Sequence, residues 1–266
     1  DRKFMPAKAT ILADGRIEVT NKKSTIRLPL ATLGPTTRFA TCTRPTDFLS
    51  LRFARTIPPE LRLPRPGNDA PVDLPHPMKV AIIHYHLATS GVSSVIERAS
   101  RELTRRGIAH VILVGHCSQG MAETLPVRVV DGLAYSDAPL DPQGAENILD
   151  ALRVAATDAL GAPPDLWHFH NHSLGKNRAI PLIVSILASQ RERLLLHIHD
   201  LAEHGRPENS RNITDIPNLY PIAPQIHYSF INSRDRHHFI KAGLPAANAH
   251  LMPNPVSDAD SISRTT

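Results

Sequence analysis

Cysteine is scarce in this chain: only Cys42 and Cys117 occur among its 266 residues. Their separation matches neither a metal-binding nor a redox motif, so we expect reduced thiols in a cytosolic protein. No apolar run approaches the roughly 18 residues that a membrane-spanning helix needs, and the pattern of a secretory signal is missing. The sequence therefore favours neither a disulfide-stabilised secreted domain nor a membrane-spanning one.

A uniform basic charge is also missing, although the formal net charge is +5. Residues 1–67 hold 13 Lys and Arg against 5 Asp and Glu, whereas the remaining residues hold 17 against 20. The larger part of the chain thus has no basic field of the kind that binds nucleic acid. We expect no nucleic-acid partner, and we interpret the basic N-terminal piece as a solvated surface.

Composition divides the chain into four parts. The first is predicted to be a small β-rich appendage or the end of an upstream domain, because it contains an Asp-Gly pair typical of a tight hairpin. The second holds seven prolines and predicts a stiff, extended linker. The third is the main domain, and the fourth is a polar tail. In order, these parts span residues 1–57, 58–77, 78–256 and 257–266.

Strands and helices alternate through the main domain. Continuous apolar runs, such as KVAIIH at residues 79–84, are typical of strands buried in a parallel sheet. The predicted strands span 79–84, 109–114, 127–130, 166–169, 194–198, 226–231 and 250–252, with helices at 92–103, 143–160, 177–190 and 234–242. Residues 205–220 lack clear periodicity and predict a loop with short turns. The alternation predicts an α/β fold with a doubly wound, Rossmann-like parallel sheet.

Polar residues follow two of these strands at the point where each strand ends. His170, Asn171 and His172 come after one strand, and His199 and Asp200 come after the next. In open α/β sheets, ligands bind outside the carboxyl ends of the strands. The sequence therefore places chemical groups where such a sheet has its binding site.

Histidine is frequent, with 15 residues, and many lie in H-x-H pairs. The series are His84/His86, His168/His170/His172 and His197/His199. Alternate residues of a strand share a face, and we interpret His168 and His197 as buried and hydrogen-bonded within the sheet. H-x-H at a strand end also suits zinc, so a histidine-based metal hydrolase is an alternative. Neither a cysteine ligand nor a carboxylate–histidine helix motif accompanies the pairs.

Three further residues suit an anionic or polar ligand. Gly91 lies at the first strand–helix junction, where backbone N–H groups and the helix dipole favour an anion. A turn glycine without a ligand is the alternative, because one glycine is no dinucleotide fingerprint. Lys176 either meets a phosphate or carboxylate or is an exposed lysine. Asp200 either orients a substrate, tunes a neighbouring histidine, or caps the next turn.

Residues 78–256 resemble the N-terminal, acceptor-side domain of retaining glycosyltransferases of the GT-B fold, family-4 type. The resemblance rests on four segments at family-like spacing: KVAIIHYH…SGVSSVIERASRELTRRG, DLWHFHNHSLGKN, LLLHIHDLAEHGRP and FINSRDRHHFIKAGLP…LMPNPV. It implies two Rossmann-like domains that face each other across a cleft. The N-terminal domain would bind the acceptor, and a C-terminal Rossmann-like domain beyond these residues would hold the nucleotide-sugar donor.

The resemblance also implies a reaction and its partners. A hexosyltransferase-type enzyme would transfer a sugar to an acceptor hydroxyl with retention, and the acceptor would be a carbohydrate or a lipid-linked molecule. The nucleotide-sugar would be a co-substrate, with no further cofactor and no metal. The fragment is expected to be inactive without its C-terminal domain. The expected location is the cytoplasm, and peripheral membrane contact stays open.

By position, the resemblance assigns roles to individual residues. His170 and His199 would be catalytic, and Gly91 would approach the donor diphosphate, with Ser90 standing where the family usually has another glycine. The acceptor-binding residues would be His86, Asn171, His172, Lys176 and Asp200. Asn232 and Ser233 would face the interdomain cleft, and either also suits the cap of the next helix. A sugar-phosphate or nucleotide-sugar binding module without transfer activity is the alternative function.

Overall fold

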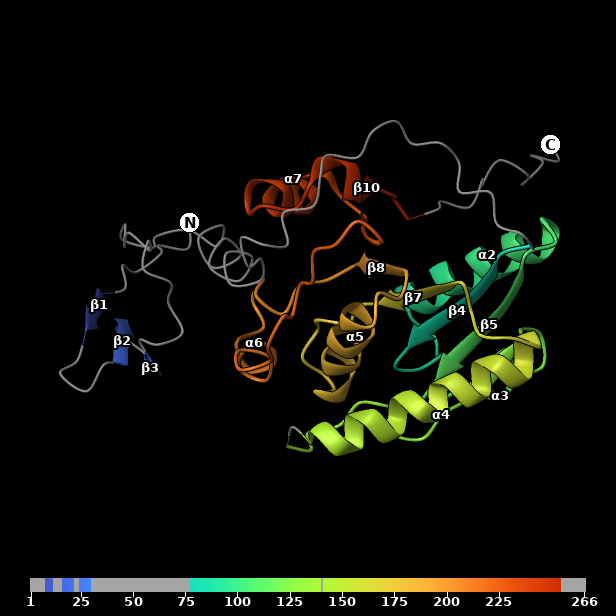
Figure 1. The fold of residues 1–266 in the computed structure, drawn as a ribbon, viewed down its shortest axis with the longest axis horizontal. Helices are drawn as coiled ribbons and strands as arrows, with labels where there is room; N and C mark the ends of the chain where they lie inside the picture. The colour runs from blue at the N-terminus through green and yellow to red at the C-terminus, as the bar shows by residue number, and fades with distance from the viewer. Residues whose placement is uncertain (1–7, 12–15, 22–23, 30–76, 140, 255–266) are drawn as a thin grey trace, which may run out of the picture.

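A computed structural model describes residues 8–11, 16–21, 24–29, 77–139 and 141–254 (Figure 1). Its central feature is a seven-stranded sheet with the order β10-β9-β8-β7-β4-β5-β6. The strands are β4 (Lys79–His84), β5 (Ala109–Val114), β6 (Val127–Val129), β7 (Leu166–His170), β8 (Leu194–Ile198), β9 (Ile226–Phe230) and β10 (Ala249–Leu251). Every neighbouring pair in this sheet is parallel. The predicted α/β class and Rossmann-like sheet are therefore confirmed.

Helices cover both faces of the sheet. Strands β4 and β5 lie between helix α2 (Gly91–Arg105) and helix α4 (Pro142–Leu160) (Figure 1). Ile82 of β4 packs in one hydrophobic cluster with Ile96 of α2, and Ile83 packs in another with Leu149 of α4. Because consecutive strand residues point to opposite faces, the continuous apolar run in β4 serves both layers, and the sheet is doubly wound.

Two further helices pack in the same layer as α4. Helix α5 (Ala179–Ser189) contributes Ile183 and Leu187 to the α4 cluster, and helix α7 (Ser233–Lys241) contributes Phe239. Three short elements are α3 (Gln119–Ala122), α6 (Pro207–Arg211) and the 3-10 turn η3 (Ala246–Asn248). Helix α6 lies in residues 205–220, where the sequence predicts a loop with short turns, because five helical residues are too few to show a periodic pattern.

Side-chain caps fix where several helices begin. Ser90 Oγ accepts a hydrogen bond from Ser93 N at the start of α2, and Asp141 Oδ1 accepts one from Gln143 N at the start of α4. Asn232 Oδ1 accepts one from Asp235 N at the start of α7. Caps of this kind satisfy N–H groups that a helix leaves without internal partners. The sequence predicts Asn232 or Ser233 as the cap of this helix, and the structure shows Asn232 in that position.

The topology creates a switch point between β4 and β7. The chain runs from β4 outward through β5 to β6, and α4 then returns it to β7 on the other side of β4. Loops after β4 and β7 therefore leave the sheet in opposite directions, and a crevice opens between them at the carboxyl ends.

No helix in the part of the chain that the structure describes is both long enough and apolar enough to cross a bilayer.

The N-terminal strands form a sheet of their own. β1 (Lys8–Ile11), β2 (Arg16–Asn21) and β3 (Ser24–Pro29) pair antiparallel, with Ile11 opposite Ile17 and Asn21 opposite Ser24. The predicted Asp-Gly turn lies outside the described residues. So do nearly all of the predicted linker at 58–77 and the whole predicted tail at 257–266.

Candidate functional site

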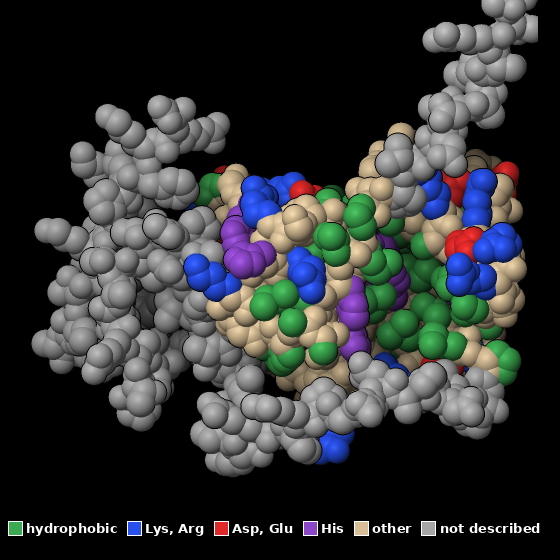
Figure 2. Space-filling model, turned by 90° about the horizontal axis from the view of Figure 1, so that it is seen from above, with side chains coloured by type: hydrophobic (Ala, Val, Ile, Leu, Met, Phe, Trp, Pro, Cys, Tyr) green, Lys and Arg blue, Asp and Glu red, His purple; other side chains and the backbone are tan. Residues whose placement is uncertain are grey.

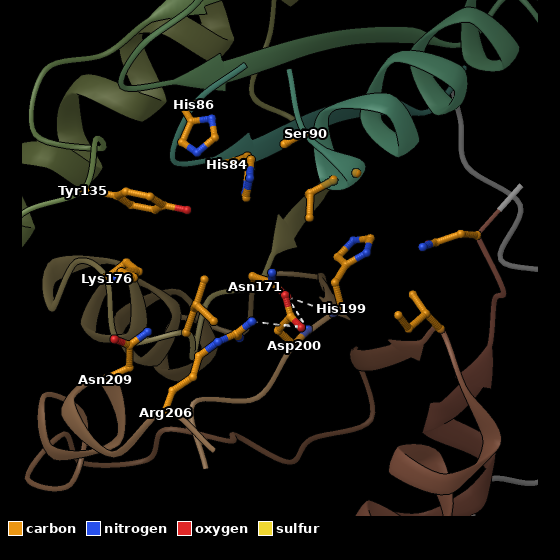
Figure 3. Close-up of a pocket in the computed structure, with 15 residues that line it drawn as sticks. His84, His86, Ser90, Tyr135, Asn171, Lys176, His199, Asp200, Arg206 and Asn209 are labelled. Atoms are coloured by element: carbon orange, nitrogen blue, oxygen red, sulfur yellow. Dashed lines mark hydrogen bonds and ion pairs between the residues drawn. The ribbon is translucent and has the colours of Figure 1, made fainter. Parts of the chain in front are cut away.

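A cavity of about 420 Å³ lies at the carboxyl ends of the strands (Figure 3). Loops that follow β4, β7 and β8 supply most of its lining, and Tyr135 reaches it from the segment after β6. The cavity thus spans the switch point between β4 and β7. The lining residues are His84, His86, Ser90, Gly91, Val92, Tyr135, Asn171, Leu174, Lys176, His199, Asp200, Arg206, Asn209, Ile231 and Asn254.

The cavity brings together many of the residues that the sequence pointed to. The predicted site residues that line it are His86, Ser90, Gly91, Asn171, Lys176, His199 and Asp200. They come from three separate loops, and these loops meet only because β4, β7 and β8 are neighbours in the sheet. The predicted residues outside the lining are His170, His172, Asn232 and Ser233.

These four residues lie behind or beside the cavity. His170 is buried in the sheet, and its Nδ1 lies 2.9 Å from Nε2 of His199. His172 is also buried, and its Nε2 lies 3.0 Å from the carbonyl oxygen of Leu219. Asn232 and Ser233 begin helix α7. His170 therefore contacts a cavity residue without reaching the cavity itself.

Other lining residues were not predicted. His84 belongs to a recognised H-x-H pair, but the sequence did not show that this strand end faces the cavity. Arg206 and Asn209 belong to residues 205–220, for which the sequence predicts a loop with short turns. Tyr135 lies in an irregular segment with no sequence signal, and Asn177 holds this segment in place. The Nδ2 of Asn177 donates to the carbonyl oxygens of Gly132 and Ala134, each at 2.7 Å.

Asn171 joins the ends of two neighbouring strands. Its Oδ1 accepts hydrogen bonds from the backbone N–H groups of His199 at 2.8 Å and Asp200 at 3.0 Å. Its own N–H donates to His197 O at 2.9 Å, and its carbonyl oxygen accepts from Tyr85 Oη at 2.8 Å. The residue adopts φ of 55°, a left-handed conformation that Asn tolerates better than most residues. One side chain thus sets the path of the chain that carries His199 and Asp200.

Burial keeps the site histidines uncharged. Burial, and to a smaller extent His197, lower the pKa of His199 to about 3. Burial also lowers the pKa of His84 to about 3 and holds that of His170 well below its ordinary value. At neutral pH each ring therefore has one N–H donor and one acceptor nitrogen. His199 can position a hydroxyl group in the cavity without placing a positive charge beside it.

Four histidines form a grid on one face of the sheet. His168 and His170 of β7 lie beside His197 and His199 at the end of β8, with ring centroids 4.2 to 5.6 Å apart for their closest pairs. His168 and His197 are buried, as predicted. Within the described residues, however, His168 Nε2 and both nitrogens of His197 have no hydrogen-bond partner, which corrects the expectation that the sheet satisfies them. Other histidine side chains reach the surface (Figure 2).

The start of helix α2 offers backbone donors to the cavity. Ser90, Gly91 and Val92 all line it, and the first turn of a helix presents N–H groups that lack internal partners. The fold itself does not require glycine at position 91, since a Cβ there would meet no atom within 4 Å and its φ is not positive. The missing side chain leaves these donors accessible to an anionic ligand.

Two cations face the opposite side of the cavity. Lys176 Nζ lies 5.8 Å from the centroid of the Tyr135 ring, and Arg206 Nη2 lies 3.2 Å from Oδ1 of Asp200 (Figure 3). Both members of the Arg206–Asp200 pair are well exposed. Such a surface ion pair contributes about 0–1 kcal/mol, so Arg206 can turn to a bound anion at little cost.

A close backbone approach places these cations beside Asn209. Gly175 has φ of 74°, and a Cβ added to it would lie only 2.1 Å from the carbonyl oxygen of Asn209. Only glycine combines this conformation with this contact. The loop that carries Lys176 therefore lies directly against helix α6, and Asn209 joins the lining between Lys176 and Arg206 (Figure 3).

Comparison with curated proteins finds a similar synthase. No known family model matches the chain. The chain is 29% identical over 190 residues to a mannosylglucosyl-3-phosphoglycerate synthase from Petrotoga mobilis (strain DSM 10674 / SJ95). The match covers 67% of this chain and 37% of the relative, so the chain spans little more than a third of that protein's length.

Among solved structures, the chain resembles Anabaena Alr3699/HepE. The complex of that protein with UDP has a TM-score of 0.45 and 16% sequence identity, and the match covers 67% of this chain and 44% of the other. Its complex with UDP and glucose has a TM-score of 0.44 and the same identity, with 67% and 45% covered.

Replacing Asn171 tests its role at the strand ends. Asn171→Ala removes an acceptor from two backbone N–H groups and leaves alanine in a left-handed conformation, so we expect a loss of about 2–4 kcal/mol in the free energy of unfolding. Asn171→Asp keeps both the acceptor and the tolerance for this conformation, and it should lose less than half as much. Urea unfolding measures both values. Equal stability of Asn171→Ala and the wild type would show that the contacts of Asn171 are dispensable.

The buried histidines predict instability in acid. Burial lowers the pKa values of His84, His168, His197 and His199 to about 3 and that of His172 to about 4. The unfolded chain binds these protons near pH 6.5, so it carries more protons than the folded protein between the two values. Stability is therefore complete above pH 6.5 and falls as the pH drops toward 3, by up to about 2 kcal/mol per buried ring at pH 5.

Urea midpoints at pH 7.5, 6 and 5 check this expectation. The midpoint should fall steeply in the wild type and less steeply in His172→Gln, which removes one buried ring. His237 is exposed on α7, so His237→Gln should keep the wild-type slope. A midpoint that stays constant from pH 7.5 to pH 5 would contradict the neutral state of the buried rings.

Proposed function

We propose that this chain supplies the acceptor-binding part of a glycosyltransferase, which moves a sugar from a nucleotide-sugar to an acceptor hydroxyl with retention. The observation that carries the proposal is the position of His199 and Asp200. They lie at the carboxyl end of β8, beside the switch point, in one cavity with a helix N-terminus and two cations. The synthase relative supports the choice of glycosyl transfer.

His199 would position the acceptor hydroxyl. It is neutral at physiological pH because of its lowered pKa, and it lines the cavity while its Nε2 contacts His170. The Nδ1 atom of His199 is thus the ring nitrogen left for the acceptor. Asp200, next in sequence, would accept a second hydroxyl hydrogen bond. Such positioning of reacting groups, with one polar or acid–base contact, typically contributes about 10²–10⁴-fold to a rate.

The first turn of α2 would face the donor. A leaving diphosphate gains negative charge as the sugar bond breaks, and backbone N–H groups aimed at that charge stabilise the transition state. Gly91 leaves those donors accessible. We propose that most of the nucleotide is held by a second Rossmann-like domain, as in a GT-B enzyme of the family-4 type, and that the transfer step itself uses no metal.

The acceptor is proposed to carry an anionic group. The name of the curated relative describes a product that contains a phosphoglycerate unit. Lys176 and Arg206 offer charge-assisted hydrogen bonds to a phosphate or carboxylate at one side of the cavity. Asn209 lies between them as a neutral donor and acceptor (Figure 3). The proposed substrate is therefore a phosphorylated or carboxylated glycoside, whose hydroxyl would reach His199.

Replacing His199 tests this assignment. In the full-length enzyme, His199→Ala should reduce kcat by about a hundredfold, because a positioned polar group is lost next to the reacting hydroxyl. His237→Ala, which changes an exposed histidine outside the cavity lining, should keep wild-type kinetics. Steady-state kinetics with a nucleotide-sugar and a phosphorylated glycoside gives both values. Unchanged turnover in His199→Ala would remove His199 from the reaction centre. Tight ligand binding with no transfer by the wild type would indicate a binding module instead.

A further inference from the structure

Three histidines outside the cavity lining bring their ring nitrogens together inside the protein. One nitrogen each from His168, His170 and His197 lies within 4.8 Å of the other two. The three side chains are 8%, 1% and 3% exposed. His168 and His170 alternate on β7, and His197 is opposite His170 in the register of β8. The parallel register of two H-x-H strands therefore produces the cluster.

The nitrogens in this cluster lack partners. Within the described residues, His168 Nε2, His170 Nε2 and both nitrogens of His197 are buried without a hydrogen bond. Ser229 Oγ is buried and unpaired as well, and Ser229 is opposite His197 in the register of β9. Buried polar atoms in native proteins nearly always have a partner. So many orphaned atoms in one place indicate a ligand that accepts several lone pairs.

A divalent metal ion has the required chemistry. Neutral imidazole is a common ligand for zinc, and the three rings are buried beside one another. Zn–N distances of about 2.0–2.1 Å place neighbouring ligand nitrogens roughly 3.4 Å apart. The rings are therefore within about 1.5 Å of coordination distance. Histidine χ2 rotates broadly, so turning the rings can close this gap without moving the strands.

We propose that His168, His170 and His197 bind one zinc ion within the sheet, with a water molecule as the fourth ligand. The water would donate a hydrogen bond to Ser229 Oγ, which gives that buried oxygen a partner. Since His168 and His197 do not line the cavity, the ion is structural and does not contact the acceptor. This site does not depend on the proposed function.

The ion would also fix the state of the cavity histidine. With His170 Nε2 on the metal, the proton of His170 lies on Nδ1 and is donated to His199 Nε2, 2.9 Å away. Groups in this position commonly set the tautomer of their neighbour. His199 would then carry its own proton on Nδ1 and present it as a donor to the cavity. His170 is accordingly a positioning residue rather than a catalytic one.

Metal analysis of the full-length protein, purified without a histidine tag, tests the site. We expect about one zinc per chain, its removal by a chelator, and a fall in Tm of roughly 5–10 °C that added zinc reverses. Cobalt added to the metal-free protein should give the visible absorption of a four-coordinate ion with nitrogen ligands. If a variant does not fold, titrating zinc into the metal-free wild type still tests whether the protein binds the ion.

Three variants test which histidines bind the ion. His197→Gln should lose the bound metal and its effect on Tm, while the exposed control His237→Gln should keep both. A second group of close ligand atoms is formed by His204, Asp235 and His238, so His238→Gln should also keep the metal. The proposal is overturned if the wild type binds no zinc after incubation with excess zinc. It is equally overturned if His238→Gln loses the ion and His197→Gln retains it.

Discussion

The arrangement of the site depends on the hydrogen bonds that Asn171 makes at the ends of β7 and β8. Its side-chain oxygen accepts from two consecutive N–H groups of the neighbouring strand end, and its own backbone contacts His197 and Tyr85. Two strands that diverged at this point would carry His199 and Asp200 away from the β4–α2 loop. One asparagine in the left-handed backbone conformation therefore fixes the position of the cavity lining relative to the sheet.

The same strand ends impose a second constraint, which is the burial of imidazole rings. Strand alternation places His168, His170 and His197 on one face, where they are buried, while His199 at the end of the row reaches the cavity. The free-energy cost of burial is large for a charged ring and modest for a neutral ring that has hydrogen-bond partners. The protein thus keeps a neutral histidine at the site, at a cost in stability in acid. A further cost is that several buried ring nitrogens have no hydrogen-bond partner among the described residues.

The sequence predicted the fold well because its signals are local and repeated. Apolar strands and amphipathic helices alternate from residue 79 onward, and the rule for strand ends placed Asn171, His199 and Asp200 at the site. What the sequence could not show is how loops that are distant along the chain meet. Tyr135 lies in an irregular segment, and Arg206 and Asn209 flank or occupy a five-residue helix, so no periodicity marked them. The resemblance implies a catalytic role for His170 and an acceptor contact for His172, but both side chains are buried outside the cavity lining, and such burial depends on tertiary packing.

Calorimetric titration with a phosphorylated glycoside and its dephosphorylated counterpart tests the account most directly. If Lys176 and Arg206 bind the anionic group, the phosphorylated compound should bind at least about tenfold more tightly, because charge-assisted hydrogen bonds contribute about 1.5–3 kcal/mol each. That preference should disappear in the double variant Lys176→Ala/Arg206→Ala and persist in Lys241→Ala, an exposed lysine on α7. Equal affinities for the two compounds in the wild type, or a preference that survives in the double variant, would contradict the assignment of this cavity to an anionic acceptor.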